Sequence, residues 1–230
     1  MPDKLPQFTL GEFLPSVLIV LCIALIGWYL VQREIERQRA FRLARLAAEV
    51  LRPIGTEGSF HWLGAGRCEL RLSQTRAPFT SFRVIIWLQS RALLPVWLFE
   101  RWRGRRDVIA FAADLTTRPL VQFEVFDPES SVGKRALQRA TSLGWETFQQ
   151  TIGGESLCVA TPNRVSAQRV IRKTIERSPF EGVHILRLAA TESSPNLNLT
   201  VDRPEALLAM GGRFPNWFGR LANAVESLPA

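Results

Sequence analysis

Few side chains in this sequence have the types and spacing that metal or redox chemistry requires. The 230 residues contain two histidines, His61 and His184, and three cysteines, Cys22, Cys68 and Cys158. No two cysteines lie at metal-ligand spacing, and three are too few for a disulfide framework. We therefore expect no bound metal and no cofactor.

The sequence also lacks the nucleophile-elbow, zinc-protease and dinucleotide-loop motifs. No Gly-x-Ser-x-Gly or His-Glu-x-x-His pattern occurs, and the glycines at 64–66 lack the third glycine of a dinucleotide loop. Glu124, Asp127 and Glu129 gather near the end of an expected strand, where they could bind a cation but more simply lie in a solvated loop. Both histidines fall in apolar segments and are expected to be structural. We expect no enzyme activity and no small-molecule substrate.

The strongest candidate for a binding site is the segment 97–106, which reads WLFERWRGRR. It places guanidinium groups and large aromatic rings within about two or three helical turns. Guanidinium groups bind phosphates through two hydrogen bonds, and aromatic rings pack on apolar partners. The alternative is a core helix whose solvent-exposed face is basic. The predicted residues for binding a partner protein, RNA or lipid are Trp97, Arg101, Trp102, Arg103, Arg105 and Arg106.

The overall charge agrees with an anionic surface as a partner. The formal net charge is +8, and the 29 basic residues include only three lysines, Lys4, Lys134 and Lys173. Arginine suits the phosphates of nucleic acids and lipid headgroups. Genome composition alone also produces such a preference for arginine, so the choice of basic residue does not identify the partner.

Residues 13–32 predict a single transmembrane helix. The segment has no charged residue, and about 20 apolar residues match the hydrocarbon layer of a bilayer. The start carries acidic as well as basic residues and no cleavage site follows, which disfavours a signal peptide. Several arginines follow the span and only Lys4 precedes it, so residues 1–12 should lie outside or in the lumen and the rest in the cytoplasm.

Residues 33–52 predict a basic amphipathic helix that continues from the span. Its apolar positions recur with helical spacing, and arginines lie between them. Such a helix lies on anionic lipid, or else it forms a stalk whose apolar stripe packs on the following domain. For the first case the predicted lipid-facing residues are Arg33, Arg37, Arg39, Arg42 and Arg45.

Residues 56–230 predict a cytoplasmic α+β domain with a mainly antiparallel sheet. Short alternating segments such as 68–72, 107–115 and 183–189 are typical of strands, and 134–148 and 166–177 have the periodicity of helices. Asn163 is a candidate cap for the second of these helices. This order of hairpins and helices favours a sheet with its helices on one face.

The order of elements resembles the calumin family, single-pass coiled-coil-domain-containing proteins of the endoplasmic reticulum. The similar pieces are the span, the strand at 82–88, the double-leucine helix from 92 with its basic end at 101–106, the strand from Asp107, and the segment 134–139. The acidic lumenal segment and the coiled-coil tail of the family have no counterpart here. The resemblance therefore does not imply calcium binding, and tail contacts with the ribosome are not carried over.

The resemblance implies a non-enzymatic scaffold or chaperone subunit that assists insertion of multipass membrane proteins near the Sec channel and the ribosome. Its partners would be the membrane, other subunits of an insertion complex and ribosomal RNA. The membrane would be the endoplasmic reticulum in a eukaryote and the plasma membrane in a prokaryote. The alternative is a lipid-surface adaptor or an assembly factor of another membrane complex. A membrane-tethered enzyme would need a deep pocket with a perturbed carboxylate.

Overall fold

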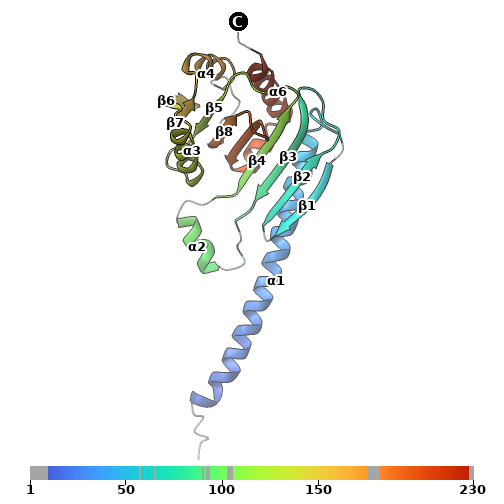
Figure 1. Cartoon of the computed structure of the whole chain (residues 1–230). Helices are drawn as coiled ribbons and strands as arrows, with labels where there is room; N and C mark the ends of the chain where they lie inside the picture. Colours follow the sequence, from blue (N-terminus) through green and yellow to red (C-terminus); the bar gives the residue numbers. More distant parts are fainter. Residues whose placement is uncertain are drawn as a thin grey trace, which may run out of the picture.

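The computed structural model describes residues 10–56, 58–64, 66–89, 91, 94–102, 106–175 and 182–227. A long N-terminal helix leads into an α+β domain built on one sheet (Figure 1). The helical elements are α1 (Leu10–Val50), α2 (Leu94–Trp102), α3 (Ser131–Ser142), α4 (Arg164–Val170), the π-helical turn η1 (Ile171–Ile175), α5 (Pro204–Leu208) and α6 (Arg213–Glu226). The strands are β1 (Gly58–Gly64), β2 (Arg67–Leu72), β3 (Phe79–Trp87), β4 (Val108–Leu115), β5 (Phe123–Phe126), β6 (Glu146–Ile152), β7 (Glu155–Thr161), β8 (Ile185–Ala190) and β9 (Leu197–Asp202).

The first half of α1 projects away from the domain. Every residue from 15 to 31 is exposed, and this part of the helix is long and apolar enough to cross a membrane. Twenty helical residues cover about 30 Å, which is the thickness of the hydrocarbon layer. The structure thus agrees with the prediction of one candidate span near the N-terminus.

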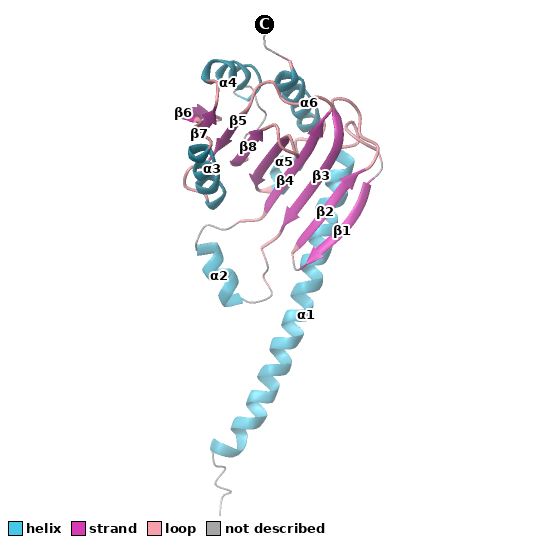
Figure 2. Ribbon diagram, in the orientation of Figure 1, coloured by secondary structure: helices cyan, strands magenta, loops and turns pink. Residues whose placement is uncertain are grey.

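The second half of α1 belongs to the hydrophobic core of the domain. Its buried apolar residues recur every three or four positions and face β2, β3 and α5; they are Ala40, Leu43, Ala44 and Ala47, and the buried Leu51 follows the helix. Figure 2 shows this part of the helix crossing behind the strands. Of the two expectations for residues 33–52, the structure supports the helix that packs on the domain. The domain therefore begins within α1, ahead of residue 56.

The nine strands form one sheet with the order β1-β2-β3-β4-β9-β8-β5-β7-β6. Neighbouring strands are antiparallel at each pairing. The late strands β8 and β9 insert between β4 and β5, so the C-terminal part of the chain joins the two halves of the sheet. The predicted α+β class with a mainly antiparallel sheet is confirmed.

One face of the sheet carries the main core under α1, α4, α5 and α6. Aromatic rings from β3, β4 and α6 cluster there, with centroids 4.6–6.5 Å apart. The cluster consists of Phe79, Phe82, Phe111, Phe214, Trp217 and Phe218. The indole of Trp217 donates a hydrogen bond to the carbonyl of Thr174 at 2.9 Å, which ties α6 to η1.

The opposite face is covered by α3, so the expectation of helices on one face is wrong. Ala136 and Ala140 of α3 pack on Phe126 and Ala160 of the sheet in a second, smaller core. Over β3, β4 and β9 this face is open to a cavity instead. The small alanines let α3 approach the sheet closely.

The helix expected over 134–148 ends at Ser142, and 146–148 belong to β6. Gly144 adopts φ +68°. Its N–H bonds the carbonyl of Thr141, and the N–H of Trp145 bonds that of Ala140, which is a Schellman stop signal. The apolar spacing predicted the helix but not its glycine end. The predicted cap of the next helix is confirmed, since Asn163 accepts a hydrogen bond from the N–H of Ser166.

Candidate functional site

α2 lies apart from the sheet, on the side of the domain from which α1 departs (Figure 1). Both connections to α2 are tied to α1. Glu36 accepts a hydrogen bond from the backbone N–H of Arg91, which precedes α2. Arg39 bonds Asp107, which follows α2, at 2.9 Å. These contacts lie four and seven residues beyond the predicted end of the span, so α2 is held near the level at which α1 leaves the domain.

The exposed side chains of α2 are mainly apolar. Trp102 is 85% exposed, and Leu98 and Phe99 are exposed as well. The guanidinium of Arg101 lies 5.7 Å from the ring of Trp97, which is a cation–π distance. Of the two expectations for this segment, the core helix with a basic back does not agree with this exposure. The apolar surface is available to a partner or to lipid.

The other predicted members of this site are distributed differently. Arg106 lies past α2 and bonds the buried carboxylate of Asp202 at 3.1 Å. That ion pair gives Arg106 a role inside the domain. Arg103 and Arg105 lie outside the described residues. The part of the predicted site that the structure brings together is therefore Trp97, Arg101 and Trp102.

A groove of about 1300 Å³ runs between α1 and the edge strand β1. One wall carries Tyr29, Arg33, Arg37, Phe41 and Arg42 from α1. The other consists of Phe60, Trp62, Gly64 and Gly66 from the β1–β2 hairpin. The rings of Phe41 and Phe60 meet edge to face at 5.8 Å, and Phe60 continues to Trp62 at 6.2 Å. Sequence reasoning missed this groove because it joins a strand to a helix that was expected to precede the domain.

The predicted lipid-facing arginines do not share one surface. Arg33, Arg37 and Arg42 line the groove. Arg39 faces the domain, where it bonds Asp107 and Glu205 of α5 at 2.9 and 2.5 Å, and this placement corrects the prediction for that residue. Arg45 is exposed elsewhere on α1 and lies 3.4 Å from Glu49.

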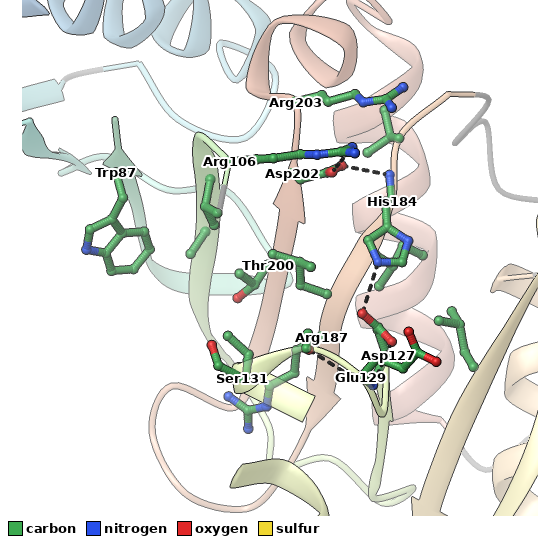
Figure 3. A pocket seen from close by; sticks show the side chains of 18 of the residues that line it. Trp87, Arg106, Asp127, Glu129, Ser131, His184, Arg187, Thr200, Asp202 and Arg203 are labelled. Carbon is green, nitrogen blue, oxygen red and sulfur yellow. Dashed lines mark hydrogen bonds and ion pairs between the residues drawn. The ribbon is translucent and has the colours of Figure 1, made fainter. Parts of the chain in front are cut away.

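A larger cavity of about 1680 Å³ lies on the open face of the sheet (Figure 3). Its floor includes Ala110 and Thr200, and its rim includes the start of α3 and the β6–β7 turn. Asp202 accepts from Arg106 and, at 3.1 Å, from the backbone N–H of His184. Charged groups in this cavity thus bond one another across strands that are distant in sequence.

Glu124 has the most buried carboxylate in this region, at 2% exposure. Arg139 of α3 holds it with two hydrogen bonds of 3.0 and 2.8 Å. Arg187 of β8 adds two more at 3.3 and 3.2 Å. The expectation that Glu124, Asp127 and Glu129 form a solvated loop is therefore wrong for Glu124, which anchors α3 to the sheet.

His184 lies between two carboxylates at the entrance to β8. Its Nδ1 is 2.5 Å from Glu155 and its Nε2 is 3.2 Å from Asp127. Burial lowers the pKa of His184, but the hydrogen bonds to Glu155 and Asp127 outweigh it, so the pKa is raised above its ordinary value. The expectation of a structural histidine agrees with these contacts.

The pKa of His184 predicts a pH-dependent contribution to stability. Because the folded-state pKa is raised, the stabilisation is complete below the unfolded pKa of about 6.5 and is lost as pH rises through the folded value. We expect His184→Gln to destabilise the protein more at about pH 5.5 than at about pH 9. Urea unfolding at both pH values measures this. His61→Gln, on the exposed strand β1, is the matched control. An equal loss at both pH values for His184→Gln would contradict the assignment.

The described residues include no group of three or more His, Cys, Asp or Glu side chains placed to hold a metal ion. Comparison with protein-family models gives no match, and comparison with curated proteins gives none either. The placement of α1, α2 and the groove is therefore the basis for the proposed function. The resemblance to the calumin family stays a prediction.

Proposed function

We propose that this protein is a non-enzymatic, membrane-anchored scaffold that assists insertion or folding of multipass membrane proteins near the Sec channel and the ribosome. The observation that carries the proposal is the apolar surface of α2, held beside the base of the candidate span. Trp102 and Leu98 are exposed there although the domain has a well-packed core elsewhere. Exposed apolar surface of this kind marks a protein or membrane contact.

The proposed orientation places the N-terminus outside or in the lumen and the domain in the cytoplasm. The arginines that follow the span on α1 support it, because basic residues remain on the cytoplasmic side. In this orientation α2 lies near the cytoplasmic membrane surface. A partner helix with polar groups in lipid costs several kcal/mol unless protein covers them, and a scaffold at this level can position the subunits that do so.

The ion pairs in and beside the large cavity indicate that these charged residues stabilise the fold. Glu124 is engaged by Arg139 and Arg187, and His184 by Glu155 and Asp127. These bonds fix α3 on the sheet, and they join the β6–β7 turn to the start of β8. The resemblance to the calumin family adds the Sec channel and ribosomal RNA to the proposed partners, and arginine-rich surface would bind the RNA through phosphates.

A second candidate function is a lipid-surface adaptor or an assembly factor of another membrane complex. The groove between α1 and β1 favours it, because three arginines and several aromatic rings line this groove just beyond the end of the candidate span. An adaptor of this kind would need neither ribosome nor Sec channel.

Crosslinking in cells, followed by purification in mild detergent and mass spectrometry, tests the two functions against each other. The first predicts recovery of Sec-channel subunits, ribosomal proteins or nascent multipass proteins. Ribosomal proteins should be released by high salt, since phosphate contacts weaken steeply with ionic strength. Recovery of one unrelated membrane complex without ribosomes would overturn the insertion function and support the adaptor.

A further inference from the structure

We propose that the groove between α1 and β1 is a binding site for one anionic phospholipid of the leaflet next to the domain. The site combines guanidinium groups of Arg33 and Arg37, an aromatic wall from β1, and the apolar end of the candidate span. It goes beyond the proposed function, because it assigns a ligand to a surface whatever partner the protein binds. The inference depends on α1 crossing a membrane.

The height of the groove along α1 matches the headgroup layer. Tyr29 and Leu30 lie within the candidate span, and Arg33 and Arg37 follow its predicted end at residue 32. At 1.5 Å per residue, Arg37 lies about 7–8 Å beyond that end. The headgroup layer extends about 5–8 Å beyond the hydrocarbon. A phosphate held by these two arginines would therefore keep its acyl chains beside Leu30 and Tyr29.

The charges in the groove favour an anion. Within the described part of the chain, no ion pair joins Arg33, Arg37 or Arg42 to a carboxylate. The two carboxylates of the groove have other contacts: Glu36 accepts from the backbone N–H of Arg91, and Glu34 accepts from the amide of Gln38 at 3.3 Å. The three guanidinium groups outnumber the two carboxylates, so the groove carries a net positive charge, and guanidinium groups bind phosphate oxygens in pairs.

The aromatic wall supplies the amphipathic surface that a lipid near its headgroup requires. Trp62 is 40% exposed, and its ring lies 6.2 Å from that of Phe60, which holds it in the wall. Tryptophan prefers the interface between headgroups and hydrocarbon. Gly64 and Gly66 at the hairpin tip line the same groove without side chains, so the phosphate can approach α1 from that side.

The test uses the full chain in nanodiscs with equal amounts of phosphatidylglycerol and phosphatidylcholine. After release into mild detergent, native mass spectrometry counts the lipids that remain bound. The wild-type protein should retain phosphatidylglycerol in preference to phosphatidylcholine. Arg33→Gln with Arg37→Gln should reduce the retained phosphatidylglycerol about tenfold, because each basic residue near a membrane surface contributes appreciably to binding an anionic lipid.

The matched control is Arg45→Gln with Arg52→Gln, which removes the same charge from exposed positions outside the groove. It should retain phosphatidylglycerol as the wild type does, and circular dichroism confirms that both variants are folded. Equal retention of the two lipids by the wild type would overturn the proposal, and so would an equal loss in both double variants. Either result leaves the partners found by crosslinking unaffected, so this failure is distinct from failure of the scaffold function.

Discussion

Replacing Leu98 and Trp102 of α2 by glutamate should reduce recovery of membrane partners at least about tenfold, without a change in folding. Removal of a tryptophan at the centre of an interface costs about 2 kcal/mol or more, and an unpaired carboxylate in its place adds a desolvation penalty. Both side chains are exposed in the structure, so the domain loses no core contact. Crosslinking with quantitative mass spectrometry measures recovery, and thermal unfolding measures stability.

The control for this variant is Leu143→Glu with Val165→Glu. These residues are also exposed and apolar, but they belong to other elements: Leu143 caps the C-terminus of α3, and Val165 lies on α4. The apolar residues of α2 give a cleaner test than Arg106, because reversal of Arg106 would also break its ion pair with Asp202 and change stability together with binding. Wild-type recovery in a folded Leu98→Glu, Trp102→Glu variant would remove α2 from the binding surface.

Phe218→Ala should cause the largest loss of stability among the single substitutions considered. Phe218 is fully buried, and its ring contacts those of Phe79, Phe82 and Phe214 at 5.6–5.7 Å between centroids. Truncation of a buried phenylalanine costs about 3–5 kcal/mol, because transfer energy is lost and a cavity remains. For a chain of this size the unfolding midpoint should fall by about 10 °C.

Thermal unfolding of the full chain in detergent, followed by circular dichroism, measures this loss. Val165→Ala is the control, since Val165 is exposed and its truncation should change the midpoint little. A small effect of Phe218→Ala would mean that α6 does not cover the sheet as the structure shows. The result also bears on function, because loosening of α6 would expose core surface that binds proteins nonspecifically.

Local patterns predicted the parts of the fold that depend on neighbouring residues. The uncharged segment 13–32 predicted the candidate span, and alternating segments predicted strands such as β2, β4 and β8. Asn163 predicted a helix start. These signals are short-range, because helix and strand periodicity and capping involve residues within a few positions of each other.

The prediction failed where a local signal was ambiguous. The apolar spacing of α3 continues past Gly144, so the prediction of a helix over 134–148 included residues 146–148, which form the start of β6. The amphipathic pattern of residues 33–52 left two interpretations open, a helix on lipid and a stalk packed on the domain, and only the structure shows that the apolar face packs on β2 and β3. Periodicity identifies an apolar face and does not say whether lipid or protein covers it.

The sequence by itself determined that one apolar helix precedes an antiparallel α+β domain and that an arginine- and aromatic-rich segment follows β3. Only the tertiary structure decided which charges meet. Glu124 bonds Arg187, which lies 63 positions later, because β8 returns to pair with β5. The groove likewise exists because β1 folds back beside α1. Such contacts depend on strand order, which is fixed by burial of the whole core and not by any segment alone.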